Sequence, residues 1–224
     1  EKNYIMSGLC IALPAHGGIV SEKTTLGLFN LGKLLVRNNI EHGLLTITNS
    51  SLITQCRSKC ANFFINNTQF DHLFFLDSDI GFEPQSVLKL LQYNMDIVSA
   101  TYPMKIYPTR YPVNIKQPEE RKGDLVKING DGMGFVMIHR RVFENIAKQY
   151  PGLKYMPCDK SSDTPSTEAE KANSFHFFAE LKNGNDYMSE DKAFFRRAEN
   201  VGYDVWMDTT IQLTHTGYHI YGAE

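Results

Sequence analysis

The sequence predicts an α/β fold in which a mixed, mostly parallel central sheet is flanked by helices and accompanied by a small antiparallel second sheet. Short apolar segments alternate with segments of helical periodicity through the first half of the chain, a pattern typical of a parallel sheet. Several apolar segments end in Gly, Pro or Asp, as strands do where they leave a sheet. The 224 residues, 42% apolar and 21% charged, are enough to bury one sizeable core. We therefore expect a single domain over residues 1–224, or one such domain from a longer chain.

Residues 1–104 have the pattern of a nucleotide-binding α/β half. Over 24–38, leucine and phenylalanine side chains recur every three to four residues, which predicts a helix with one buried face. Ser50 or Ser51 is placed to cap the next helix, and Pro84 suits the first turn of a third. Apolar runs predict strands over 5–13, 43–48, 72–76 and 96–101.

Residues 105–224, the other half of the domain, follow a different pattern. Prolines at positions 108, 112 and 118 mark loops, and the strands after them are expected to be antiparallel and mixed. The stretch 157–174 is polar and without periodicity, which predicts a loop of the kind that often acts as a lid. Strands are predicted over 125–128, 134–138, 204–207 and 211–214, and helices over 141–149 and from Ser189 to about Asn200.

Composition argues against several kinds of partner. A net charge of −2 provides no general attraction for nucleic acid. No apolar run is long enough to span a bilayer. The four cysteines include no CxxC pair, so we expect reduced thiols in a cytoplasmic protein rather than a zinc site.

The motif Asp77-Ser78-Asp79 directly follows the apolar run over 72–76. Acids that follow a strand of an open α/β sheet face the cleft where such sheets bind ligands. Strand alternation would direct Asp77 and Asp79 to the same side, and two carboxylates that close favour a divalent cation between them. The alternative is a turn or a helix cap, since Gly81 and Pro84 follow.

Three further acid–base side chains are candidates for the same site. His215 follows the last predicted strand, and an imidazole beside carboxylates suits manganese-like metals, although it can equally be a surface or core histidine. Glu190 and Asp191 open a predicted helix. Acids there are explained by the helix dipole, or one of them acts as general base for a substrate hydroxyl.

Glycines and cations complete the set of candidates. Gly132 and Gly134 precede a predicted strand, where they form either a tight turn or a wall that a substrate approaches closely. Arg57 and Lys105 follow strands and are either phosphate contacts or surface charges. Tyr102, Tyr107, Tyr111 and Trp206 are either platforms for a glycan or ordinary core and rim residues.

These motifs together resemble the GT-A-fold nucleotide-sugar glycosyltransferases, most closely the family 2-like members that include small glycosyltransferase domains of large DNA (algal) viruses and phages. The resemblance covers nearly the whole chain. It depends on five stretches in the family's order: IALPA at 11–15, FLDSD at 75–79, GMGF at 132–135, SED at 189–191, and residues 206–215. A viral protein of this kind would act in the host cytoplasm.

The resemblance implies a metal-dependent transfer of a sugar from a nucleotide-diphosphate donor, UDP-sugar above all, to a hydroxyl of a glycan or glycoprotein acceptor. It implies that Asp77, Asp79 and His215 hold Mn²⁺ or Mg²⁺, and that Asp191, with Glu190 beside it, is the catalytic base of an inverting reaction. The positions implied in donor binding are Pro14, Ala15, His16, Thr48, Arg57, Asp77, Ser78, Asp79, Lys105, Gly132 and Gly134.

Two other functions compete with this interpretation. A nucleotidyltransferase would share the α/β half and the metal, but it normally has a glycine-rich basic loop after its first strand, and here His16-Gly17-Gly18 is followed by Lys23 only later. A catalytically inactive sugar-nucleotide or glycan-binding module would lack a metal ligand or the base. All of those residues are present in the sequence.

Overall fold

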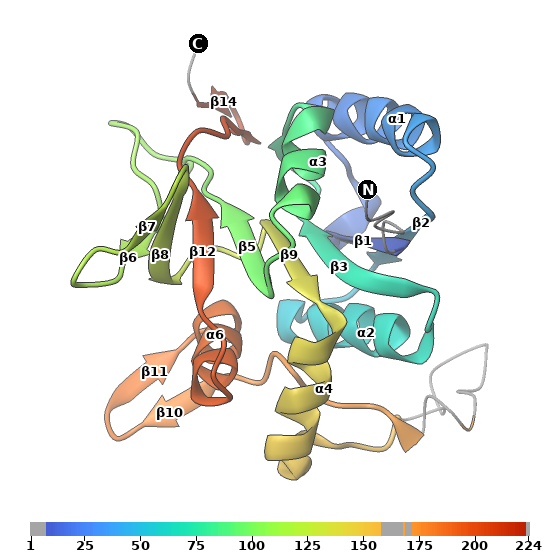
Figure 1. Ribbon diagram of the computed structural model, residues 1–224, viewed down its shortest axis with the longest axis vertical. Coiled ribbons are helices and arrows are strands. Elements are labelled where there is room, and N and C mark those ends of the chain that lie inside the picture. Colours follow the sequence, from blue (N-terminus) through green and yellow to red (C-terminus); the bar gives the residue numbers. More distant parts are fainter. Residues whose placement is uncertain (1–7, 158–167, 169–171, 223–224) are drawn as a thin grey trace, which may run out of the picture.

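The computed structural model describes residues 8–157, 168 and 172–222 (Figure 1). Its central feature is a nine-stranded sheet with the order β2-β1-β3-β9-β5-β12-β8-β6, and β7 pairs with β8 beside this path. The pairings make β8 and β9 run opposite to all the other strands. The strands are β1 (Gly8–Ala15), β2 (His42–Thr48), β3 (Phe70–Leu76), β5 (Ile97–Ala100), β6 (Asn114–Ile115), β7 (Arg121–Lys122), β8 (Leu125–Gly130), β9 (Phe135–His139) and β12 (Val205–Asp208).

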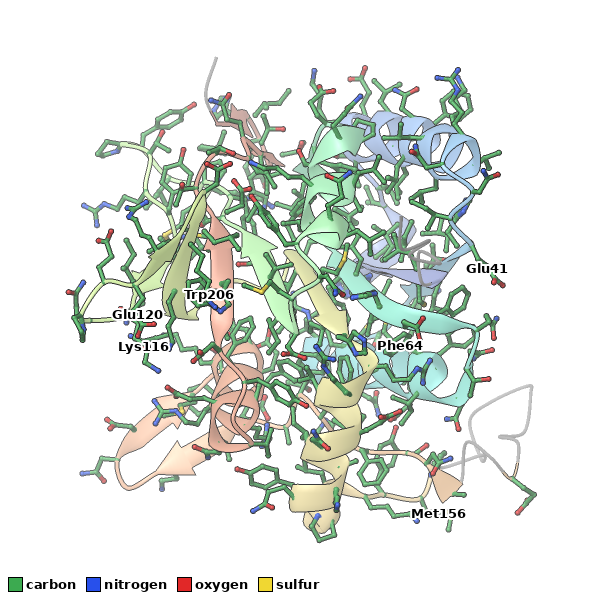
Figure 2. All side chains as sticks on the ribbon, viewed as in Figure 1. Glu41, Phe64, Lys116, Glu120, Met156 and Trp206 are labelled. Atoms are coloured by element: carbon green, nitrogen blue, oxygen red, sulfur yellow. The ribbon has the colours of Figure 1, made fainter. Side chains whose placement is uncertain are left out.

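Helices cover both faces of this sheet (Figure 1). On one face, α1 (Glu22–Arg37) and α3 (Pro84–Gln92) pack with the even-numbered side chains of β3, β5 and β12. On the other face lie α2 (Ile53–Asn66), α4 (Arg140–Gln149) and α6 (Glu190–Asn200). Figure 2 labels one member of each cluster, Phe64 of α2 and Trp206 of β12. The alternation of strand side chains thus produces two cores, one on each side of the sheet.

Aromatic side chains attach α6 to the sheet. The rings of Phe178 and Phe194 are stacked with centroids 4.7 Å apart, and Phe178 meets Phe75 of β3 edge to face at 5.3 Å. All three side chains are buried. This packing fixes the start of α6, where Glu190 and Asp191 lie, relative to the end of β3, where the two aspartates lie.

Two small sheets complete the fold. β4 (Ile80–Gly81), β13 (Thr214–Thr216) and β14 (Ile220–Tyr221) form an antiparallel three-stranded sheet in which His215 pairs with Ile80. β10 (Leu181–Asn183) and β11 (Asp186–Met188) form a hairpin before α6. Short 3₁₀ turns, His16–Gly18 and Pro151–Leu153, follow β1 and α4.

The predicted fold class is confirmed: an α/β domain with a mixed sheet, helices on both faces and a small antiparallel sheet. Each predicted helix is present, with ends that differ by a few residues. The predicted strand over 5–13 begins at Gly8 among the described residues, because residues 1–7 lie outside them. Cys158 and most of the predicted loop over 157–174 also lie outside the described residues.

The structure corrects two predictions about elements and contains a hairpin that the sequence did not indicate. The strand expected over 211–214 is instead β13 at Thr214–Thr216, which pairs with β4 and not with the central sheet. Neither Ser50 nor Ser51 caps α2, whose N-cap is Leu52 without a side-chain hydrogen bond. The β10–β11 hairpin was not predicted, because its sequence LKNGNDYM has little apolar alternation and its stability comes from pairing and not from burial.

The structure shows no helix, within the residues that it describes, that is long and apolar enough to cross a membrane.

Candidate active site

The candidate site lies where several strands of the central sheet end. β1, β3, β5 and β12 run in the same direction, so their carboxyl ends meet at one edge. Asp77 and Asp79 follow β3 and Tyr102 follows β5. Open α/β sheets bind ligands at this edge, in the crevice outside the carboxyl ends of the strands.

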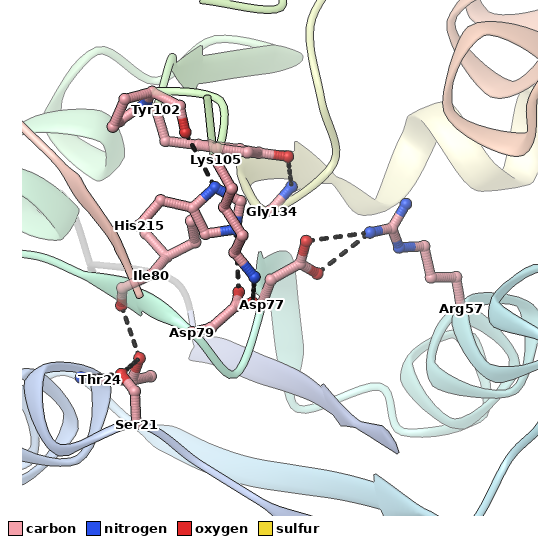
Figure 3. A network of polar contacts seen from close by, with 11 residues as sticks. Ser21, Thr24, Arg57, Asp77, Asp79, Ile80, Tyr102, Lys105, Gly134 and His215 are labelled. Atoms are coloured by element: carbon pink, nitrogen blue, oxygen red, sulfur yellow. Dashed lines mark hydrogen bonds and ion pairs between the residues drawn. The ribbon is translucent and has the colours of Figure 1, made fainter. Parts of the chain in front are cut away.

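Asp79 is in contact with two basic side chains that come from distant parts of the chain (Figure 3). The Lys105 ammonium nitrogen is 2.5 Å from Oδ2, and His215 Nε2 is 3.4 Å from Oδ1. β13 brings His215 here, since it pairs with Ile80 and Thr216 N donates a hydrogen bond to the Asp79 carbonyl oxygen at 2.8 Å. The small antiparallel sheet therefore attaches the C-terminal segment to the aspartate turn.

The hydrogen bonds of His215 determine which ring nitrogen faces Asp79. Nδ1 is 2.9 Å from the carbonyl oxygen of Pro103, which can only accept, so Nδ1 carries the proton. When both ring nitrogens are protonated, Nε2–H donates to the Asp79 carboxylate. When the ring is neutral, Nε2 has a lone pair that a cation could share with Asp79. Tyr102 packs its ring edge to face against the imidazole, with centroids 5.2 Å apart, and so holds the ring in place.

The pKa of Asp79 is lowered. Burial favours the neutral acid, but the hydrogen bonds and charges of His215 and Lys105 outweigh it. A carboxylate that stays ionised, beside an imidazole that can give up its Nε2 proton to a competing cation, is a donor pair suited to a divalent cation.

Asp77 has a different partner from Asp79. The Arg57 guanidinium of α2 places Nη2 3.0 Å from Oδ1 and 3.3 Å from Oδ2 of Asp77, while its Nη1 is 2.7 Å from Oε1 of Glu190. Burial opposes the charge of Arg57, but the two carboxylates outweigh it and raise the pKa of the guanidinium. Arg57 thus bridges the β3 turn and the first residue of α6.

A glycine turn forms the wall beside Asp77. Gly134 accepts a hydrogen bond from Asp77 N at 2.9 Å through its carbonyl oxygen, and its own N–H donates to the Tyr102 hydroxyl at 3.3 Å. A Cβ on Gly134 would lie 2.7 Å from Asp77 Oδ2, and one on Gly132 would overlap the Tyr102 hydroxyl. Both positions need glycine because the Tyr102 and Asp77 side chains fill the space that a Cβ would occupy, which is a packing requirement of the turn itself.

Asp191 lies in the first turn of α6, next to the Arg57 contact of Glu190. Its Oδ1 accepts hydrogen bonds from the Ser189 hydroxyl and from Lys192 N. The predicted capping of this helix by Ser189 is therefore indirect, since the Ser189 side chain bonds to Asp191 and not to a backbone N–H. Within the part of the chain that the structure describes, Oδ2 of Asp191 has no hydrogen-bond partner.

Four of the residues predicted to bind the donor lie together at the ends of β1 and β2: Pro14, Ala15, His16 and Thr48. Ala15 is paired with Thr48, and His16 Nδ1 is 3.1 Å from the Ser50 carbonyl oxygen. The loop after His16 reaches the aspartate turn, where Ser21 N donates to the Ser78 carbonyl oxygen at 2.8 Å. These residues and the aspartates therefore share one edge of the sheet.

No group of three or more His, Cys, Asp and Glu side chains that could hold a metal occurs in the described residues. Asp79 and His215 meet, whereas Asp77, the third predicted ligand, is paired with Arg57. A carboxylate and an imidazole nitrogen can bind Mn²⁺ or Mg²⁺ if phosphate oxygens and water supply the other ligands, as these ions prefer oxygen-rich shells. The residues present therefore fit a metal that binds together with a diphosphate.

The structure adds two residues that the sequence interpretation did not place in the site. The sequence left Tyr102 open between a glycan platform and an ordinary core or rim residue; it is 9% exposed and supports His215 and Gly134. Trp206 is likewise buried, which leaves Tyr107 and Tyr111 as the exposed aromatics of that group.

Asp131, in the glycine turn, is the second addition. It is 4% exposed, its Oδ1 accepts from Gly132 N at 2.7 Å and from the Thr101 hydroxyl at 3.3 Å, and burial raises its pKa to about 6. The negative charge of Asp191 contributes to this rise to a smaller extent than burial does. An acid between two glycines was the only available signal, and on its own it is typical of a turn.

Comparisons with known proteins support the fold. No family model matches the chain, and no curated protein is similar to it in sequence. Among solved structures, the chain is similar to A197 from STIV, with a TM-score of 0.54 and 20% identity over 94% of this chain and 86% of that one. At this identity the similarity concerns the fold.

Weaker similarities, at TM-scores of 0.48 and 0.47, are to GalNAc-T7 with UDP, GalNAc and Mn²⁺ and to UDP-glucose pyrophosphorylase complexed with UDP-glucose. The similarity to GalNAc-T7 has 10% identity and extends over 98% of this chain and 44% of GalNAc-T7. The similarity to the pyrophosphorylase has 8% identity and extends over 93% of each chain. The function of this chain therefore has to be argued from its own site.

Proposed function

We propose that this protein is a metal-dependent glycosyltransferase that transfers a sugar from a nucleotide-diphosphate donor, UDP-sugar above all, to a hydroxyl of a glycan acceptor. The observation that carries the proposal is the contact between Asp79 and His215 at the carboxyl edge of the sheet, with Lys105 beside them. A carboxylate, an imidazole lone pair and an ammonium group at one point suit a divalent cation and a diphosphate.

Asp79 and His215 would hold Mn²⁺ or Mg²⁺, and Asp77 would take part once a ligand competes with Arg57. Such an ion supplies positive charge to the bridging oxygen of the departing nucleoside diphosphate. The Lys105 ammonium lies beside Asp79. It would therefore add a second positive charge next to the departing diphosphate. Ser78 and the residues at the ends of β1 and β2 would enclose the nucleoside.

Asp191 is the proposed base of an inverting reaction. Its neighbour Glu190, the other candidate, is engaged with Arg57 at 2.7 Å, whereas Oδ2 of Asp191 is open to an acceptor. As the acceptor oxygen attacks the sugar, Oδ2 takes its proton. The glycine turn at Gly132 and Gly134 would lie against the donor sugar and the acceptor.

The division into a nucleotide-sugar half (1–104) and an acceptor half (105–224) is part of the same proposal. Asp77, Asp79 and Arg57 come from the first half, and Asp191, His215 and Lys105 come from the second. The three described cysteines, Cys10, Cys56 and Cys60, are free and buried, which suits the proposed cytoplasmic location.

The experiment that tests the proposal is a titration of nucleotide sugars by calorimetry with and without Mn²⁺. We expect Mn²⁺ to strengthen binding of the correct donor and Asp79→Ala to reduce that gain by tenfold or more, because one of two protein ligands is lost. Asp71→Ala, at the opposite end of β3, is the matched control and should bind as the wild type does.

Turnover assays complete the test. Release of a nucleoside diphosphate that depends on an acceptor supports the proposal. Formation of pyrophosphate from a nucleoside triphosphate and a sugar phosphate would identify a nucleotidyltransferase instead. Binding without any turnover would identify a sugar-nucleotide-binding module, and equal Mn²⁺-dependent affinity in Asp79→Ala would contradict the metal assignment.

A further inference from the structure

The side chain of Arg57 is 6% exposed and lies between carboxylates from two separate elements. One is Asp77 in the turn after β3, and the other is Glu190 in the first turn of α6. These elements are far apart in the sequence and also carry the proposed metal-binding and proton-accepting groups. The guanidinium is thus a direct polar link between the two sides of the candidate site. Figure 3 shows its contact with Asp77.

A buried cation with two acids is a costly way to stabilise a fold. Taking charges out of water requires a large desolvation energy, and replacing such a group by packed apolar residues is often neutral or stabilising. Here one cation faces two anions, and Arg57 Nε has no hydrogen-bond partner among the described residues. The arrangement therefore calls for an explanation other than the stability of the fold.

What the arrangement supplies is geometric constraint. The guanidinium is planar and rigid, so its two terminal nitrogens hold the Asp77 and Glu190 carboxylates in a fixed relation. Asp77 is held from its other side as well, through its N–H bond to the Gly134 carbonyl oxygen. Glu190 directly precedes Asp191, so a fixed Glu190 also limits where Asp191 can point.

We propose that Arg57 and Glu190 are positioning residues that hold Asp191 at a fixed position relative to the Asp77–Asp79 turn. The base then lies next to the acceptor oxygen when the acceptor is beside the donor sugar. This inference rests on the proposed transferase function. It assigns Glu190 a role distinct from that of a base. A displacement of about 1 Å between reacting groups can cost about a hundredfold in rate, so such a constraint has kinetic value.

The test compares variants at Glu190 with a matched pair on the same helix. Glu190→Ala removes the contact, whereas Glu190→Gln retains an oxygen that can accept from Arg57. We expect Glu190→Ala to lower kcat for transfer about 10- to 100-fold while the donor KM changes less than threefold, and Glu190→Gln to recover most of the loss. Glu199→Ala, which breaks the 2.5 Å pair with Lys116 at the other end of α6, should leave both constants unchanged.

A second readout is the ratio of transfer to hydrolysis of the donor. Water needs no alignment with a bound acceptor, so loss of positioning should lower transfer more than hydrolysis. If Glu190 were the base, Glu190→Gln and Glu190→Ala would be equally inactive, which would overturn the proposal. Equal losses of transfer and hydrolysis would overturn it as well.

Amide hydrogen exchange tests the link even if no sugar is transferred. Arg57→Lys should speed exchange both in the turn at 77–79 and in the first turn of α6, because one side chain constrains both. Faster exchange in only one of these segments would contradict the proposed link. Absence of transfer by the wild type with every donor would instead contradict the proposed function, so the two failures are distinguishable.

Discussion

At the scale of single residues, Asp77 and Asp79 have different surroundings although one residue separates them. Asp79 contacts Lys105 and His215, and Asp77 contacts Arg57. The difference arises because β3 ends at Leu76, so the aspartates lie in a turn and strand alternation no longer directs both side chains to one side. Asp79 is therefore the aspartate that lies beside the imidazole, whereas Asp77 is engaged with a guanidinium.

Asp191→Asn tests the base at this scale. The amide retains a hydrogen-bond acceptor for Ser189 and Lys192 but cannot take a proton, so we expect donor affinity within about twofold of the wild type and transfer reduced by at least about a hundredfold. Calorimetry measures the first quantity and release of nucleoside diphosphate the second. Transfer at the wild-type rate would mean that another group is the base or that the reaction retains configuration.

The residues of the site differ in how far they could be predicted from the sequence. Asp79 follows an apolar run, Asp191 opens a predicted helix and His215 follows a predicted strand, and polar side chains at such positions indicate function. In the structure, His215 lies within β13. Tyr102 and Asp131 gave no such signal, because each acts through contacts with residues distant in sequence, Gly134 and His215 for the first and Thr101 for the second.

At the scale of elements, the glycine turn is the most constrained connection at the site. β8 and β9 run in the same direction yet are separated in the sheet by β12 and β5. Residues 131–134 must therefore cross from the end of β8 to the start of β9 over one face of the sheet. Asp131 and Met133 are buried along this path, and Gly134 reaches Asp77.

Gly134→Ala tests the fit of this turn. The added methyl group would lie 2.7 Å from Asp77 Oδ2 and 2.9 Å from the Tyr102 ring, so Asp77 and Tyr102 must both move. We expect a destabilisation of about 1–3 kcal/mol and weaker donor binding. Urea unfolding and calorimetry provide the two measurements.

Gly32→Ala is the matched control for that substitution. Gly32 lies in α1, and a Cβ there has no neighbour within 4 Å. Alanine in a helix interior should stabilise the protein by about 0.5–1 kcal/mol and leave donor binding unchanged. A similar loss of binding in both variants would show that the effect of Gly134→Ala is unrelated to its position.

At the scale of the whole molecule, one sheet separates two apolar cores, and the site lies at the edge where both end. Asp131 is buried on the face that α6 covers, and its ionisation therefore affects the stability of the entire domain. The folded-state pKa of about 6 exceeds the usual value of 3.8. The folded state thus binds this proton more tightly than the unfolded chain does.

The consequence is a pH-dependent contribution to stability with a defined sign. The contribution is fully present below about pH 4 and is lost as the pH rises through about 6, with a total of about 2–3 kcal/mol. Asparagine at position 131 cannot ionise, so the Asp131→Asn variant does not lose this contribution. The free energy of unfolding of the variant minus that of the wild type should therefore be larger at pH 7 than at pH 4. Urea unfolding at both pH values measures it, with Asp186→Asn of the β10–β11 hairpin as the surface control. If the difference in free energy of unfolding between variant and wild type is the same at both pH values, ionisation of Asp131 does not destabilise the folded state.

The sequence by itself determined the alternation of strands and helices, the fold class and the acids that follow β3 and open α6. These features are local, because hydrophobic periodicity and turn residues express which face of each element is buried. Tertiary structure alone decided that Asp79 and not Asp77 meets His215, that Arg57 divides its charge between Asp77 and Glu190, and that Tyr102 supports the glycine turn. Those contacts join residues whose spacing along the chain carries no information about their distance, since only strand order and packing bring them together.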